Sequence, residues 1–272
     1  MASPVPFPLY GVADPVSSAT HLFGAVVAAA AAPPLLNRSR GGHRLSLAIF
    51  SMAAVLLLSC SAIFHWARAT EWRHALQRLD HAAIFILIAG TFTPIHAMLF
   101  AGLARWGMLG LIWTIAAAGI ALKLAFFETC PAWLGIGAYV AMGWLGVYAM
   151  TALSLRYGVR FMWPLLLGGI IYTLGAAVEL AEWPLLWPRV VRPHELFHLA
   201  VLAGLACHWW FIARVANLAA DHASGLEPRW RERTATTWPE ATAQAPSSRT
   251  EAAAPHLPQA PGHPIPNPRF EP

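Results

Sequence analysis

Charged residues are scarce in this sequence. Only 11% of its 272 residues are Asp, Glu, Lys or Arg, 57% are hydrophobic, and the mean hydropathy is +0.52. Soluble globular domains carry about 25% charged residues, so the composition excludes that class and indicates a polytopic membrane protein. The net charge of +5 comes from arginines in loops and near the C-terminus. These arginines form no basic stripe interleaved with aromatic residues, so we expect no nucleic-acid partner.

Cysteine is also scarce. The three cysteines, Cys60, Cys130 and Cys207, lie in or beside apolar segments. No two of them have the close spacing of a zinc knuckle. We therefore expect them to pack in the protein interior rather than to carry chemistry.

Long apolar runs fill most of the first 218 residues. A helix needs about 20 apolar residues to cross a hydrocarbon core about 30 Å thick. Seven windows of this length occur, at residues 17–36, 45–66, 80–100, 107–127, 133–153, 162–181 and 194–218. The sequence therefore predicts an all-α integral membrane protein, a bundle of seven transmembrane helices. The short connections leave no room for a soluble domain between them.

The two ends of the chain differ from this bundle. Residues 1–16 have no basic region ahead of an apolar core, so we expect no cleavable signal peptide. Residues 219–272 are rich in Ala and Pro and have few large apolar side chains, a composition that predicts a disordered tail. The predicted domain organisation is thus an N-terminal segment (1–16), a transmembrane domain (17–218) and a tail (219–272).

Three histidines lie at predicted helix ends. His194 and His198 are four residues apart at the start of the last helix, so they project from one face, and His65 ends the second helix. Threading the chain through a membrane puts all three at the same depth. Ionisable groups in spanning segments are costly and mark functional sites. Three imidazoles are a ligand set of catalytic zinc, whereas closed structural sites usually contain cysteine. We therefore predict a metal site at His65, His194 and His198.

Three further polar residues are expected at this depth. Asp80 begins the third predicted helix, and Ser61 lies one turn deeper than His65 on the same helical face. Glu179, near the end of the sixth helix, is either a metal ligand or a partner of a ligand, or a solvated helix-end charge, and we favour the solvated charge. The remaining intramembrane histidines are expected to be interfacial or hydrogen-bonded: His21, His81, His96 and His208.

Four ordered segments of the chain resemble the bacterial hemolysin III family. They are Ser61–His65, Leu79–Pro94, Gly168–Ala176 and His194–Gly204. Thr20, His21 and Gly24 are similar to the first-helix signature of that family, and Asp14 stands where an acidic residue is usual. The resemblance runs from about residue 14 to 218 and leaves the tail uncovered. It relates the chain to the progestin and adiponectin receptors and, more distantly, to the alkaline ceramidases.

The resemblance implies a site and an activity. His65, His194 and His198 would bind Zn²⁺, Asp80 would hold or activate a zinc-bound water, and Ser61 would complete the polar shell. The likeness to ceramidases extends this to a zinc-dependent hydrolase of lipid amides or esters, with Asp80 and Ser61 as its catalytic residues. One alternative is a non-enzymatic receptor or membrane-homeostasis protein with a structural zinc. A minor alternative is a pore-forming, cytolytic protein.

Residues 194–198 also match the HExxH pattern of zinc proteases, in which the glutamate is the general base. Intramembrane proteases with this motif resemble one another in adding an aspartate ligand from a later helix, and no apolar segment follows residue 218. Glu195 also points about 100° away from the two histidines around the helix. We therefore interpret Glu195 as a helix-start acid favoured by the helix dipole.

Membrane lipids and a lipid-like small molecule are the expected partners, and the bacterial inner (plasma) membrane is the expected location. The arginine distribution favours a cytoplasmic C-terminus. The resemblance to adiponectin receptors implies a cytoplasmic N-terminus instead, and for a seven-helix chain the two indications disagree.

Overall fold

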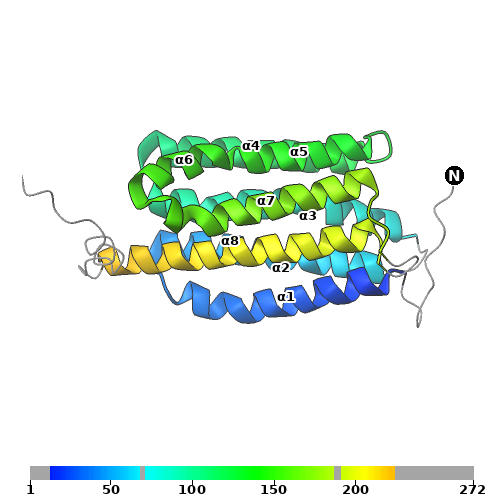
Figure 1. The fold of residues 1–272 in the computed structure, drawn as a ribbon, viewed down its shortest axis with the longest axis horizontal. Coiled ribbons are helices and arrows are strands. Elements are labelled where there is room, and N and C mark those ends of the chain that lie inside the picture. The colour runs from blue at the N-terminus through cyan, green and yellow to red at the C-terminus, as the bar shows by residue number, and fades with distance from the viewer. Residues whose placement is uncertain (1–12, 68–70, 187–190, 224–272) are drawn as a thin grey trace, which may run out of the picture. The chain divides into compact units, whose positions relative to one another are not determined.

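The computed structural model describes residues 13–67, 71–186 and 191–223, with side chains up to residue 219. Most of the predicted N-terminal segment and of the predicted tail lies outside the described residues. The described part folds into helices that run side by side (Figure 1). They are α1 (Pro15–Leu36), α2 (Gly41–Trp66), α3 (Arg73–Leu99), α4 (Gly102–Ala125), α5 (Ala132–Trp144), α6 (Gly146–Tyr157), α7 (Val159–Ala181) and α8 (Pro193–Ala223).

Seven crossings of membrane-spanning length and apolarity result, as predicted, because α5 and α6 together form the fifth, Ala132–Tyr157. The break falls at Leu145, where the backbone N–H bonds the carbonyl of Met142. Gly143 and Gly146 flank this residue, and each glycine weakens a helix by about 1 kcal/mol relative to alanine. A local interruption of the fifth crossing is the consequence.

Several helices begin earlier than the apolar windows predict. The third helix starts at Arg73 instead of Asp80, because helical hydrogen bonding continues through the polar headgroup zone where an apolar window ends. Asp80 therefore lies about 10 Å inside the helix, at about 1.5 Å per residue. Similarly, α8 continues to Ala223, a few residues into the segment assigned to the tail.

The centre of the bundle is α3. In its most apolar window 67% of the residues are buried, against 22% in α4. It packs against α2, α4, α5 and α8, while α1 packs against α2 and α8, and α7 packs against α8. Glycines allow the closest approaches: a Cβ at Gly90 would lie 2.7 Å from the Ala53 Cβ of α2, and one at Gly175 would lie 2.6 Å from the Ala200 Cβ of α8.

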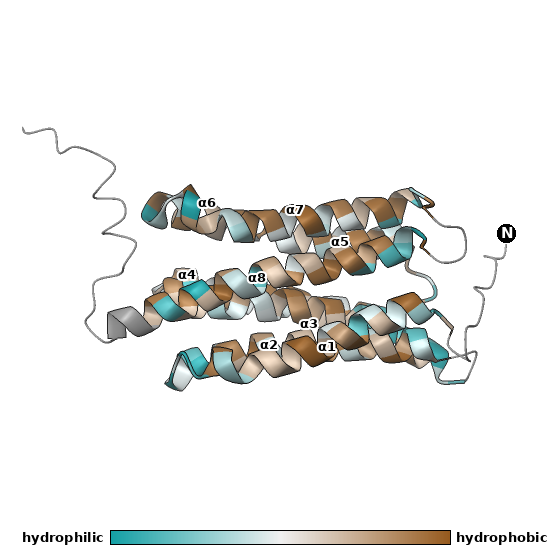
Figure 2. Ribbon diagram, turned by 60° about the horizontal axis from the view of Figure 1, so that its bottom comes forward, coloured by the Kyte–Doolittle hydropathy of each residue, from teal (hydrophilic) through white to brown (hydrophobic). Residues whose placement is uncertain are grey.

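Large apolar side chains cover the outside of the bundle. Phe23 and Met52 are 70% and 71% exposed, which water would penalise but lipid accommodates. Hydrophobic residues occupy the middle of the helices and hydrophilic residues gather toward their ends (Figure 2). This pattern is that of an integral multi-pass membrane protein.

The helices alternate in direction, so each end of the bundle collects residues far apart in sequence. We call the end where α2 ends at Trp66 and α8 begins at Pro193 the histidine end. The opposite end, where α3 ends at Leu99 and α6 ends at Tyr157, is the far end.

Candidate metal centre

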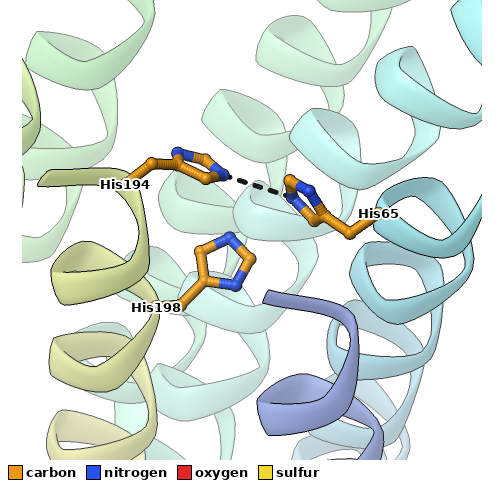
Figure 3. A group of neighbouring side chains, drawn as sticks. All are labelled: His65, His194 and His198. Atoms are coloured by element: carbon orange, nitrogen blue, oxygen red, sulfur yellow. Dashed lines mark hydrogen bonds between the residues drawn. The ribbon is translucent and has the colours of Figure 1, made fainter. Parts of the chain in front are cut away.

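Three imidazoles converge at the histidine end. His65 comes from the last turn of α2, and His194 and His198 come from the first two turns of α8. One ring nitrogen of each lies within 4.8 Å of the others, and the Nε2 atoms of His65 and His194 are 3.2 Å apart (Figure 3). The juxtaposition predicted from helix threading is therefore present.

Two carboxylates hold the outer nitrogens of this group. His65 Nδ1 donates to Asp14 Oδ2 at 3.2 Å, and His194 Nδ1 donates to Glu179 Oε1 at 3.1 Å. An ionised carboxylate only accepts hydrogen bonds, so the proton of each imidazole resides on Nδ1. Carboxylate–histidine pairs of this kind fix the tautomer and orientation of metal-binding imidazoles.

These tautomers leave an unshared electron pair on each Nε2 of His65 and His194, and the two pairs face each other across 3.2 Å. With both rings neutral neither atom has a proton to donate, and either a proton added to one ring or a metal cation between them would offset the repulsion. Two nitrogens bound about 2.0–2.1 Å from a tetrahedral zinc lie about 3.3–3.4 Å apart. The donor set and this spacing therefore fit zinc.

The third imidazole has a different environment. His198 is 2% exposed, and its Nδ1 has no hydrogen-bond partner in the described structure. The ring of His21, from α1, stacks on it with centroids 3.8 Å apart and planes inclined by 15°. His198 is thus held by an aromatic ring rather than by a carboxylate.

Asp80 and Ser61 lie together below the histidines. Both are buried, and the Ser61 hydroxyl lies close enough to the Asp80 carboxyl group to interact with it. Asp80 also lies within electrostatic range of His194. The predicted neighbourhood of these two residues is present, although Asp80 comes from within α3 and not from its start.

The interpretation of Glu179 as a solvated helix-end charge is wrong. Its carboxylate accepts the hydrogen bond of His194, and its side chain is 27% exposed. The last turn of α7 lies beside the first turn of α8, because the two helices pack along their length. This packing brings the carboxylate to the imidazole.

Glu195 has the helix-start role that we predicted. It is 4% exposed and accepts hydrogen bonds from the backbone N–H of Arg192 at 2.8 Å and from Ser17 Oγ at 3.3 Å. An acid three residues after the helix cap, bonded back to the cap N–H, is half of a capping box. The carboxylate therefore caps the start of α8 and links it to α1.

Asp14 joins four segments just outside the first crossing. Its backbone N–H bonds the carbonyl of His65, and its carboxylate also contacts Arg192 at 3.4 Å and Arg73 at 3.5 Å. Burial by itself raises the pKa of this carboxyl group. The hydrogen bond with His65 and the positive charges of Arg192 and Arg73 together hold the pKa below its ordinary value.

Three of the other histidines have ordinary hydrogen-bond roles, as expected. His81, His96 and His208 each bond a backbone carbonyl, of Gln77, Ala104 and Leu165 respectively. His21 differs: neither of its ring nitrogens meets the hydrogen-bond geometry with a described residue, and its ring packs on that of His198. Its position in the second turn of the first helix was the available signal, since α1 starts at the histidine end. The cysteines are all free thiols.

Comparison with known proteins gives a consistent result. The sequence model of the haemolysin-III related family matches residues 11–209. The chain is 32% identical over 191 residues to hemolysin-3 of Bacillus cereus, covering 69% of this chain and 84% of the relative. It is 30% identical over 167 residues to the hemolysin-3 homolog of Bacillus subtilis (strain 168), covering 61% and 75%. It is 24% identical over 226 residues to the adiponectin receptor protein of Drosophila melanogaster, covering 72% and 49%.

Proposed function

Because this chain belongs to the haemolysin III family, within the superfamily of the adiponectin receptors, we propose that His65, His194 and His198 bind one Zn²⁺ ion. The protein is an integral multi-pass membrane protein of the bacterial plasma membrane. One observation carries the zinc proposal: the two facing Nε2 atoms, 3.2 Å apart, whose outer nitrogens are both held by carboxylates. A bound cation gives that arrangement a physical reason.

The proposed reaction is hydrolysis of a lipid amide or ester. Zinc bound by three imidazoles supplies a Lewis acid that polarises a carbonyl and lowers the pKa of water. Asp80 is the proposed general base and takes the proton of the water that attacks the carbonyl carbon. When the carbon–nitrogen or carbon–oxygen bond breaks, Asp80 returns that proton to the leaving atom. The proposed role of Ser61, whose hydroxyl lies near the Asp80 carboxyl group, is to donate a hydrogen bond that orients the carboxylate.

A lipid substrate is proposed because of where the histidines lie. They sit at the ends of spanning helices, near the headgroup level of a bilayer, so an acyl chain in the surrounding lipid has the shortest route to them. Asp14 and Glu179 act as positioning residues, because they bond the imidazoles and not the reacting atoms.

Metal content tests the zinc site. We expect about one zinc per chain by inductively coupled plasma mass spectrometry, lost in His65→Ala, His194→Ala and His198→Ala. The matched control is His208→Ala, which removes a buried histidine of the same helix. Protein purified without chelator that contained no metal would refute both the zinc site and the hydrolase.

Turnover tests the reaction separately. Zinc-loaded protein in lipid is assayed against a panel of ceramides, other N-acyl lipids and lysolipids, with Asp80→Asn as the inactive control. Release of fatty acid by the wild-type protein but not by Asp80→Asn supports the hydrolase proposal. If zinc-loaded protein binds lipid but releases no fatty acid, the hydrolase proposal is refuted and the zinc site is retained.

A structural zinc is the second candidate, and one observation favours it. The ligands come from α2 and α8, and their carboxylate partners come from the segment before α1 and from α7. One ion thus connects four parts of the bundle. In a receptor or homeostasis protein of this kind, chelation lowers the thermal unfolding temperature and removes no turnover.

A further inference from the structure

The described acidic side chains gather at one end of the bundle. Every described acidic side chain lies at the histidine end: Asp14, Glu71, Asp80, Glu128, Glu179, Glu182 and Glu195. The far end carries mainly basic residues, including Arg38, Arg40, Arg44, Arg105, Arg156, Arg160 and Arg214, together with Asp221 in the last turn of α8. An anion at the far end therefore meets many more basic than acidic described residues.

Several far-end arginines are engaged within the protein. Arg38 donates to Asn217 Oδ1 at 3.2 Å, Arg105 donates to the carbonyl of Phe100, and Arg214 donates to the carbonyl of Phe161. Arg156 differs, because its guanidinium lies over the ring of Tyr157, 5.2 Å from the centroid. Among the described residues no ion pair involves Arg156.

A cavity of about 170 Å³ lies beside this guanidinium. Its walls are Met98 and Leu99 from α3, Arg156 and Tyr157 from α6, and Leu218 and Ala219 from α8. One water molecule occupies about 30 Å³ in the liquid, so the space admits a phosphodiester group. The lining thus combines one guanidinium with apolar side chains, the two kinds of group that contact a lipid headgroup and its acyl chains.

We propose that the cavity between α3, α6 and α8 at the far end binds a phosphate-bearing anion, with Arg156 as its cationic contact. Guanidinium groups bind phosphate oxygens through two parallel hydrogen bonds. Basic pockets between spanning helices are sites for anionic lipid headgroups. Leu155 and Val159 flank Arg156 and Tyr157 in the sequence, are 87% and 63% exposed, and offer apolar surface to the attached acyl chains. An anionic phospholipid therefore fits better than free phosphate.

This site is separate from the metal centre. His194 and Leu218 lie 24 positions apart in α8, which corresponds to about 36 Å along the helix at about 1.5 Å per residue. Loss of one site therefore leaves the other in place, and the test below does not depend on zinc or on turnover.

Native mass spectrometry of the full chain in neutral detergent tests the proposal. The probes are phosphatidylglycerol, phosphatidylcholine and inorganic phosphate, added separately. We expect the wild-type protein to retain phosphatidylglycerol, and Arg156→Gln to bind it about tenfold more weakly, a loss of about 1.4 kcal/mol. The matched control is Arg160→Gln, which removes an exposed arginine of the same end that does not line the cavity.

A second variant tests the cavity without changing charge. Ala219→Phe fills the space and leaves Arg156 in place, so it should weaken binding as Arg156→Gln does, and Arg156→Lys should keep part of it. Thermal unfolding of each variant verifies the fold. Equal losses in Arg156→Gln and Arg160→Gln with no effect of Ala219→Phe would overturn the proposal, because a diffuse surface charge then accounts for binding. Binding of inorganic phosphate alone that depends on Arg156 would assign the cavity to free phosphate.

Discussion

His21 lies flat against His198, with ring centroids 3.8 Å apart and planes 15° apart. The contact joins α1 to α8 directly at the candidate metal centre. Neither His21 nitrogen has a described hydrogen-bond partner, so the ring acts on His198 by stacking. It is the aromatic counterpart of the carboxylates that hold His65 and His194.

Replacement of His21 therefore separates ring stacking from metal ligation. We expect His21→Ala to lower zinc affinity about 10- to 100-fold, the range typical of residues that orient a ligand, because His198 gains rotational freedom. His21→Phe keeps an aromatic surface and should keep most of the affinity, measured by competition with a chelator. If the phenylalanine variant loses as much affinity as the alanine variant, the stacking role is wrong and a nitrogen of His21 is needed.

Glu179 gives a second test of the positioning groups. Glu179→Gln still offers a carbonyl oxygen to His194 but removes the negative charge, so zinc affinity should fall by about 10- to 100-fold while the fold is retained. The matched control is Glu128→Gln, which removes an exposed carboxylate at the same end that pairs with Arg78 at 3.4 Å. Equal affinities in the two variants would contradict the role assigned to Glu179.

Asp80 should separate metal binding from turnover. Asp80→Asn keeps the size and the hydrogen bond with Ser61 but cannot accept a proton, so zinc content should stay at the wild-type level. If the lipid hydrolase proposal is correct, kcat should fall by about 10²- to 10⁴-fold. Ser61→Ala should have a smaller effect on kcat, because the serine only orients the carboxylate. Full activity of the asparagine variant would remove Asp80 from the mechanism.

Gly175 tests the packing that delivers Glu179 to the site. A Cβ there would lie 2.6 Å from the Ala200 Cβ, and a methyl group of α8 cannot move aside without the helix. Gly175→Ala should therefore destabilise the protein by about 1–3 kcal/mol and also weaken zinc binding. Gly169→Ala, in the same helix with no atom within 4 Å of the new Cβ, should be neutral or slightly stabilising. Thermal unfolding in detergent and zinc competition measure the two effects, and similar destabilisation by both variants would refute the packing argument.

The sequence predicted much of this architecture because the constraints are local. Each span needs a continuous apolar run of fixed length, and alternating helix directions then fix which helix ends share a membrane face. That is why His65, His194 and His198 were found together despite 129 positions between the first two. The helix starts were less accurate, because an apolar window cannot detect the polar turns that extend α3 back to Arg73.

The positioning groups required the tertiary structure. Glu179 was favoured as a solvated charge, and His21 was grouped with ordinary hydrogen-bonded histidines. Both residues act on a neighbouring helix, and the sequence alone does not show which faces of two helices are in contact. Only the packing of α7 and α1 against α8 determines that a carboxylate and a ring meet His194 and His198.

By itself, then, the amino-acid sequence determined the seven crossings, the depth of the three histidines and their likeness to one family, since these follow from hydropathy, periodicity and motif order. The tertiary structure alone decided which nitrogens face one another, which side chains orient them, and where a cationic cavity opens at the far end. These features depend on contacts between helices. Such contacts arise from the shapes of helix surfaces that are far apart in the sequence, and from glycines that allow the helices to approach closely.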